Sequence, residues 1–205
     1  MQVFNPAQRW LRHAGMDDTA SIESVFARAR QAMVEAGNPN QWGAKYPYPD
    51  TISGDISGRH AMLLVDDMAD GAQAAPGASV ERPELEERRG EHERVIGVFA
   101  LFDGVDPAYG QIEGSWLDDD PYMTVHRVAS SGEAKGVAAD ILSWCMRHHS
   151  NVRVDTGLQN HAMQHILESN GFTRCGLITM HDSRDPSTEH TRIAYQRHDR
   201  PGAQV

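Results

Sequence analysis

Residues 122–145, YMTVHRVASSGEAKGVAADILSWC, decide the fold. The stretch begins with a β-like run, passes through the small-residue turn SSGEAKG, and continues with apolar residues at helical spacing. Such a turn between a strand and a helix aims unpaired backbone N–H groups and the positive end of the helix dipole at one point. The order therefore predicts a binding site for an anion such as a diphosphate.

Three residues of this turn support that interpretation. A larger side chain at Gly136 or Ala138 would hold a diphosphate away from the backbone, and Lys135 adds a positive charge nearby. Other nucleotide sites fit less well, because the turn lacks both the Gly-Lys-Ser/Thr of a P-loop and the full Gly-x-Gly-x-x-Gly of a dinucleotide fold.

The sequence after this helix strengthens the prediction. Residues 152–156, VRVDT, are typical of a short buried strand. Asn160 then precedes a helix with Met163, Ile166 and Leu167 on one face, and the pair Gly171-Phe172 closes the block.

Together these residues resemble the GNAT superfamily, whose members transfer an acetyl group from acetyl-CoA to an amine. The resemblance covers most of the chain. The family's pyrophosphate loop, Gln/Arg-x-x-Gly-x-Gly/Ala, matches Glu133, Ala134, Lys135, Gly136, Val137 and Ala138, and its Asn-helix-Gly-Phe block matches residues 160–172. The chain is also similar to a bacterial subgroup, through Gln41-Trp42, Tyr46-Pro47, residues 114–117, His126-Arg127 and Asp155-Thr156.

The resemblance implies an α/β GNAT fold, with a mixed, mostly antiparallel central sheet of about six to seven strands flanked by helices and splayed at the cofactor site. It implies acetyl-CoA as co-substrate. Val128, Ala129 and Ser130 would pair with the pantetheine arm like an added strand, and residues 133–138 would hold the diphosphate. Asn160 would hydrogen-bond the pantetheine or the surroundings of the leaving sulfur.

Two residues depart from the family pattern. Glu133 stands where Gln or Arg is usual, so its side chain should point away from the phosphates or pair with Lys135 or Arg127. Leu167 stands where many members have a Tyr that protonates the departing thiolate. Holding amine and thioester in attack geometry is worth about 7 to 11 kcal/mol, more than the roughly 4 to 5 kcal/mol needed to deprotonate a lysine-like amine. Activity is therefore still expected.

Two residues are candidates for the base that accepts the amine proton. Glu113 is expected on a central strand beside the acetyl-binding strand, either as a base or as an ion-pair partner of Arg127. His126 has a suitable intrinsic pKa of about 6.5 but could equally be a packed strand residue. Because side chains alternate along a strand, only one of His126 and Arg127 should face the cofactor side.

The acceptor side falls, in the resemblance, on the segment QWGAKYPYPD. Trp42 and Tyr46 are candidates to line an amine pocket, with Tyr48 beside them, or they cap the core beneath a long loop. Asp155 either attracts a cationic amine or caps a turn. The acceptor would be the amine of a small molecule or of a protein.

The sequence leaves one alternative to an enzyme. A non-catalytic acyl-CoA sensor is the alternative to an enzyme, and Leu167 and Glu133 favour it. A metal site is not predicted, because the His161/His165 pair lacks a third ligand at a recognisable spacing. Neither cysteine is placed to form an acyl-enzyme, so direct attack by the amine is expected.

Composition indicates an ordinary globular protein. The 205 residues predict a single domain, 1–205, with a flexible insert at 67–93 that is poor in large apolar residues; its ELEERR could instead form a short helix. A net charge of −10 argues against nucleic acid as a partner. No apolar run could span a membrane and no signal peptide is evident, so we expect a cytoplasmic location. Edge strands near the C-terminus favour a homodimer.

Overall fold

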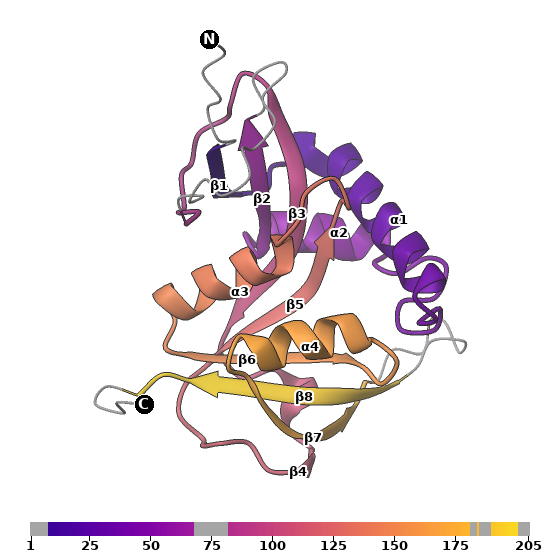
Figure 1. Cartoon of the computed structure of the whole chain (residues 1–205), viewed down its shortest axis with the longest axis vertical. Helices are drawn as coiled ribbons and strands as arrows, with labels where there is room; N and C mark the ends of the chain where they lie inside the picture. Colours follow the sequence, from indigo (N-terminus) through magenta and orange to yellow (C-terminus); the bar gives the residue numbers. More distant parts are fainter. Residues whose placement is uncertain (1–7, 68–81, 181–183, 185–189, 201–205) are drawn as a thin grey trace.

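A computed structural model describes residues 8–67, 82–180, 184 and 190–200. Over these residues the chain forms eight strands, four α-helices and two short 3-10 helices (Figure 1). None of these helices is long and apolar enough to cross a lipid bilayer. In chain order the elements are β1 (Gln8–His13), η1 (Met16–Asp18), α1 (Thr19–Glu35), α2 (Pro49–Ser57), β2 (Ala61–Asp67), β3 (Glu93–Asp103), η2 (Pro107–Tyr109), β4 (Glu113–Gly114), β5 (Met123–Ser130), α3 (Val137–His148), β6 (Asn151–Gly157), α4 (His161–Ser169), β7 (Thr173–Thr179) and β8 (Thr191–His198).

The strands form one sheet in the order β1-β2-β3-β5-β6-β8-β7-β4. Among the neighbouring pairs of these strands, only β5 and β6 are parallel, and α3 supplies the long connection that parallel neighbours need. The mixed, mostly antiparallel α/β sheet that the sequence predicts is confirmed. The eighth strand is the two-residue β4, which contains Glu113.

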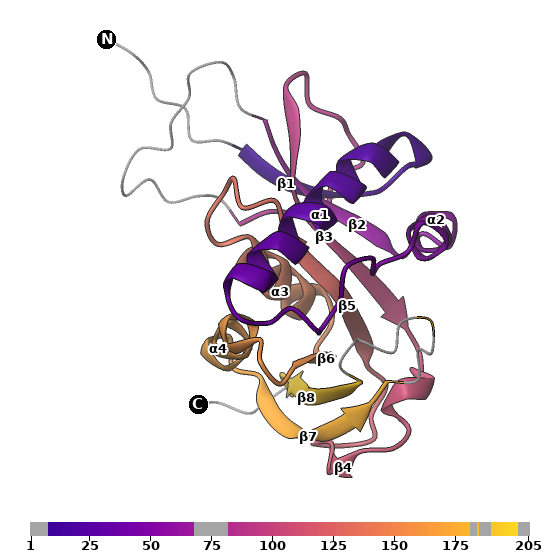
Figure 2. The ribbon, with the colours of Figure 1, turned by 90° about the vertical axis from the view of Figure 1, so that its right-hand side faces the viewer.

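Two apolar cores lie on opposite faces of this sheet. Ile141 belongs to the core under α3 and α4, and Phe26 belongs to the core under α1 and α2. Because side chains alternate along a strand, β2 contributes Leu64 to the first core and Leu63 to the second. In Figure 1, α3 and α4 lie in front of the strands and α2 behind them, and Figure 2 shows α2 and α4 on opposite sides of the sheet.

The sheet opens between its two parallel strands. Met123, Thr124 and Val125 of β5 pair with Val152, Arg153 and Val154 of β6, but the later residues of these two strands do not pair with each other. Residues 126–130 and 155–157 therefore diverge, as the splayed strands of the prediction require. The gap leaves one backbone edge of β5 free for a ligand.

A β-bulge at Arg127 accompanies this opening. Val98 of β3 opposes Ala129, whereas Ala100 opposes His126, so two residues of β5 face one residue of β3. Arg127 takes up the extra length with a left-handed φ of 56°. The bulge breaks the alternation of side chains at this point in β5.

Residues 82–92, the second part of the segment for which we predict flexibility, run beside β1. Leu85 forms a parallel bridge with Leu11, whose N–H donates to Glu84 O and whose carbonyl accepts from Glu86 N. Arg88 lies over the ring of Trp10. The helix considered for ELEERR is therefore wrong: these residues cover the edge of β1 in extended form. Residues 68–81 lie outside the described residues, and the flexibility of the segment stays a prediction.

Candidate active site

The gap between β5 and β6 opens into a cavity of about 950 Å³. Its walls come from α1, the loop before α2, β5, β6 and α4. The candidate base His126 lines the cavity, together with most of the residues predicted to bind cofactor or acceptor, which are Trp42, Tyr46, Val128, Ala129, Ser130, Ala138, Asp155 and Asn160. Residues far apart in the sequence thus meet where the strands separate.

Ser130, at the start of the small-residue turn, and Ala138, in the first turn of α3, both line the cavity. Gly132 and Gly136 have left-handed φ values of 78° and 77°, and a Cβ added at either would meet open space. Gly136 is the N-cap of α3 and provides no side-chain cap, so the first N–H groups of the helix have no partner within it. Open glycines and an uncapped helix start fit a diphosphate.

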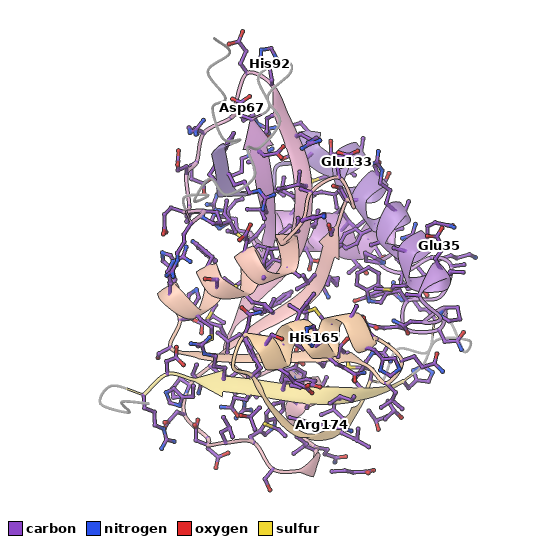
Figure 3. The ribbon with its side chains drawn as sticks, viewed as in Figure 1. Glu35, Asp67, His92, Glu133, His165 and Arg174 are labelled. Atoms are coloured by element: carbon purple, nitrogen blue, oxygen red, sulfur yellow. The ribbon has the colours of Figure 1, made fainter. Side chains whose placement is uncertain are left out.

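Glu133 does not oppose an anion in this turn. Its carboxylate pairs with Arg28 of α1, and Arg94 of β3 lies 3.7 Å from it. Figure 3 shows Glu133 beside α1. Its side chain does point away, but the pairing with Lys135 or Arg127 that we also considered is wrong. The acidic residue at the first loop position is neutralised within the protein.

The remaining residues of the turn also contact the core and β1. Ala134 packs against the core under α3, and Val137 is buried in it. The carbonyl oxygen of Lys135 accepts a hydrogen bond of 3.0 Å from Arg9, which also pairs with Asp140 in the first turn of α3. These contacts hold the turn against β1 and the first turn of the helix.

His126 sits between two carboxylates. Its Nε2 lies 2.6 Å from Asp106 Oδ2, and its Nδ1 lies 3.4 Å from Asp155 Oδ1. Burial alone would favour the neutral ring, but the hydrogen bonds to Asp106 and Asp155 outweigh it and raise the pKa of His126 to about 9. The same contacts lower the pKa of both carboxyl groups against the opposing effect of burial. His126 is therefore mostly an imidazolium at pH 7.

Asp155 has two further partners. The hydroxyl of Tyr109 donates a hydrogen bond of 2.8 Å to its Oδ1, and Arg192 Nε lies 4.0 Å from its Oδ2. Burial, followed by the charge of Asp155, raises the pKa of Tyr109 well above its usual value, so this hydroxyl stays a donor. Asp155 is thus a charged cavity residue and not a turn cap.

Arg127 also lines the cavity, next to His126. It donates to Asp55 Oδ1 of α2 at 2.8 Å and to the Tyr46 hydroxyl at 3.2 Å, while both His126 and Arg127 contact the ring of Phe102. The expectation that only one of the two can face the site is wrong, because the bulge at Arg127 breaks the alternation.

Glu113 lies outside this cavity. It is exposed on β4, which pairs only with β7 within the described sheet, at the outermost position of the strand order. The central position expected for it is therefore wrong. Cys175 lies on β7, and Cys145 is a residue of α3 whose side chain is buried in the core, where burial raises the pKa of its thiol.

Asn160 is fixed as the N-cap of α4. Its Oδ1 accepts from Met163 N, and its Nδ2 donates to Gln41 Oε1 at 2.9 Å. Arg192 donates to the Gln41 carbonyl at 2.7 Å. Gln41 thereby ties the loop before α2 to α4 and β8, and this leaves Asn160 less free for a ligand than the resemblance implies.

The sequence suggests that Trp42 and Tyr46 either line an amine pocket or cap the core, and in the structure they contact both the cavity and the core. Trp42 packs edge to face on Phe26, with ring centroids 5.7 Å apart, and Tyr46 lies 6.2 Å from Trp42. Both contribute to the core under α1, and both line the cavity. Leu167, in contrast, is fully buried, while Met163 and Ile166 of the same helix line the cavity.

The sequence does not predict a place in the cavity for Asn38, Gln41, Asp106 or Arg192, nor the hydrogen bond from Tyr109 to Asp155. Asp106 precedes Pro107 in a turn that reads as surface loop, and only the fold brings it to His126. Gln41 belongs to the Gln41-Trp42 pair of the resemblance, but no local sequence pattern predicts its hydrogen bond to Asn160, the N-cap of α4.

One cluster of metal-ligating residue types forms elsewhere in the described chain, from Asp118, Asp120 and His198. Arg200 lies 3.1 Å from Asp118 and 3.8 Å from Asp120, and His198 Nδ1 lies 2.8 Å from Asp118. Both carboxylates thus already have the Arg200 guanidinium as a partner, so we assign no metal to them.

Comparison with known proteins gave structural matches only. No family model and no curated protein matches the chain. An acetyltransferase of the GNAT family from Streptococcus agalactiae is 26% identical, with a TM-score of 0.70 over 94% of this chain and 96% of that one. A GNAT-family acetyltransferase from Listeria monocytogenes has a TM-score of 0.57 at 13% identity over 93% and 94%. The protein yncA from Salmonella typhimurium, solved with its cofactor acetyl-CoA, has a TM-score of 0.54 at 13% identity over 96% of both chains.

Proposed function

We propose that this chain, which belongs to the GNAT acetyltransferase superfamily, moves an acetyl group from acetyl-CoA to a primary amine by direct attack. One observation carries the proposal. The cavity in the gap between β5 and β6 extends from His126, which lies between two carboxylates, to Ser130 and to Ala138 in the first turn of α3, the helix whose N-cap Gly136 provides no side-chain cap. A single ligand with a reactive acyl end and a diphosphate would fit such a gap.

In this proposal the cofactor lies along the free edge of β5. Val128, Ala129 and Ser130 would pair with the pantetheine arm, as an added strand would. Residues 133–138 would hold the diphosphate through backbone N–H groups, with Gly136 giving close access. Acetyl-CoA supplies the activated acetyl group, and the protein supplies position and charge.

The acceptor enters from the opposite side of the gap. Asp106 and Asp155 offer two carboxylates to an ammonium group, and His126 holds both in place as their shared donor. Trp42 and Tyr46 provide aromatic surface beside them. A primary amine, which is cationic at neutral pH, suits this wall better than a neutral or acidic acceptor.

The protonated state of His126 changes the role that we assign to it. With a pKa of about 9, His126 keeps its proton at pH 7 and cannot accept another. We therefore give His126 a positioning role, and the amine loses its proton to solvent before attack. Only a small fraction of the amine is deprotonated at pH 7. Holding the amine and the thioester in attack geometry offsets this cost, because proximity is worth about 7 to 11 kcal/mol.

A non-catalytic acyl-CoA sensor remains the second candidate, and Leu167 favours it. Leucine has no hydroxyl, and this side chain is fully buried in the core. Position 167 of α4 therefore offers no proton donor to the departing sulfur. A sensor would bind acetyl-CoA through the same turn and gap but would release no CoA.

The two functions differ in a simple assay. A panel of polyamines, amino sugars, amino acids and peptide N-termini is incubated with acetyl-CoA, and free thiol is followed with time. An acetyltransferase releases one CoA per acetylated amine for at least one member of the panel. Release at the buffer rate for every amine, together with tight acetyl-CoA binding, would favour the sensor. A labelled acetyl-enzyme or ping-pong kinetics would contradict direct attack.

A further inference from the structure

Thr156, at the end of β6, carries a buried hydroxyl that has no use in the fold. The side chain is 1% exposed, and its Oγ1 has no hydrogen-bond partner among the residues that the structure describes. An unpaired hydroxyl in a protein interior costs free energy, so native proteins satisfy nearly all of them. Thr156 also lines the cavity. A group of this kind is suited to a ligand that enters the cavity.

The position of Thr156 in the gap indicates which ligand it meets. Thr156 lies two residues beyond Val154, the last residue of β6 that pairs with β5. Val152 and Val154 point into the core under α3 and α4, so alternation places Thr156 on that same face. Asp155 faces His126 and Tyr109 instead. Adjacent residues thus serve the two sides of the gap, and Thr156 is on the side of α3 and α4.

From this arrangement we infer that the Thr156 hydroxyl donates a hydrogen bond to the sulfur of bound CoA, and so stabilises the thiolate that leaves when acetyl is transferred. The inference rests on the proposed function. In the step, the amine nitrogen bonds to the carbonyl carbon, the carbon–sulfur bond breaks, and sulfur keeps the electron pair. The proton shed by nitrogen restores the thiol, and Thr156 keeps its own proton. Leu167 provides no such donor.

Thr124 offers a matched control. It is also buried, at 0% exposure, and its Oγ1 likewise lacks a partner among the described residues, but it is not one of the residues that line the cavity. Replacing either threonine with the near-isosteric valine removes an unsatisfied hydroxyl from the interior. Neither Thr156→Val nor Thr124→Val should therefore lower the melting temperature.

The test follows the thiol of CoA bound to the full chain, through the ultraviolet absorbance of the thiolate against pH. A hydrogen bond donated to the thiolate should lower the pKa of the bound CoA thiol by about one unit or more, because it stabilises the charged form. Thr156→Val should raise the pKa of the bound thiol by that amount, while Thr156→Ser and Thr124→Val keep the wild-type value. An unchanged pKa in Thr156→Val would overturn the inference.

Affinity for desulfo-CoA, which lacks the sulfur, provides the second arm. Above the thiol pKa, Thr156→Val should bind CoA about tenfold more weakly than wild type and should bind desulfo-CoA equally well. Equal losses for both ligands would place the hydroxyl elsewhere on the cofactor and overturn the inference, while leaving the proposed function intact. A wild-type chain that binds neither ligand would instead remove the proposed function, and this inference with it.

Discussion

At the scale of single residues, the chemistry of the site depends on how His126 is held. Its ring has a carboxylate on either side, Asp106 at 2.6 Å and Asp155 at 3.4 Å. A histidine with one polar neighbour would have remained a candidate general base at neutral pH. The protonated His126 ring instead compensates part of the negative charge of Asp106 and Asp155 and lies between the two carboxylates.

The charge of His126 predicts how stability varies with pH. Its pKa is raised from 6.5 to about 9 on folding, so its contribution is complete below pH 6.5 and is lost as the pH rises through 9. This pKa shift corresponds to about 3 kcal/mol in the free energy of unfolding. Urea unfolding of wild type should therefore weaken between pH 6.5 and 9, and His126→Gln should lack that decline. An imidazole NMR titration with a midpoint near 6.5 would contradict this prediction.

The contrast between Asp155 and Glu113 gives a second prediction. Asp155→Asn should lower kcat/KM for the amine by about tenfold or more, since it removes a buried charge facing the acceptor. Glu113→Gln changes an exposed residue at the sheet edge, so kcat/KM should stay within about twofold. Steady-state kinetics on both variants decides the matter, and a large loss in Glu113→Gln would restore that residue to the mechanism.

These residues also show where sequence interpretation ends. His126, Asp155 and the small-residue turn were found because a strand end and a helix start have local signatures. Glu113 was misplaced because a residue pattern can indicate a strand but carries no information on its order in the sheet. Asp106 was missed because its link to His126 exists only after the chain has folded.

At the scale of secondary structure, the bulge in β5 shapes the proposed acceptor pocket. It turns Arg127 toward α2, where the guanidinium meets Asp55, while His126 remains in the cavity. Neither the register shift nor the left-handed φ of a non-glycine residue can be predicted from alternation of side chains, and the tertiary contacts of Arg127 with Asp55 and Tyr46 hold it there.

The Arg127–Asp55 pair predicts the cost of releasing α2 from β5. Burial raises the pKa of Asp55 and Arg127 opposes that rise, so Arg127→Leu leaves a buried carboxylate without its cation. We expect a loss of about 3 kcal/mol at pH 7 by urea unfolding. The loss should shrink at acid pH, since a carboxyl group with a raised folded pKa favours the folded state only when protonated.

An exposed arginine gives the control for this experiment. Arg59 is 71% exposed and pairs with Glu87 at 3.3 Å, so Arg59→Leu should cost less than about 1 kcal/mol at either pH. Addition of Asp55→Asn to Arg127→Leu should regain much of the loss. Equal costs for the two arginine variants would show that the Arg127–Asp55 pair does not hold α2.

At the scale of the whole molecule, one sheet separates a core under α3 and α4 from a core under α1 and α2, and its central opening gives access to both sides. The recognition of a GNAT fold from the sequence is confirmed. It succeeded because the small-residue turn and the Asn-helix-Gly-Phe block are continuous in sequence. The proposed acceptor side is assembled from α1, the turn at Asp106, β6 and β8, so its details required the fold.

Ligand binding through this opening should stabilise the whole chain. If acetyl-CoA binds only the folded state, a concentration 100 times its Kd adds about 2.7 kcal/mol to the free energy of unfolding. Thermal unfolding should then shift upward with acetyl-CoA and with CoA as one transition. Desulfo-CoA, which keeps the diphosphate, should give a similar shift, and an absence of any shift would contradict cofactor binding.

The most direct test of the central claim is calorimetric titration of acetyl-CoA into wild type, Gly136→Glu and Gly104→Glu. Both glycines have left-handed φ values, 77° and 90°, with open space at Cβ, but only Gly136 caps α3. Each variant therefore adds one carboxylate at a left-handed position with open space around its Cβ. We predict binding by wild type and Gly104→Glu and its loss in Gly136→Glu, because a carboxylate would occupy the diphosphate position. Equal binding by all three proteins, or no binding by wild type, would contradict the assignment of this gap to acetyl-CoA.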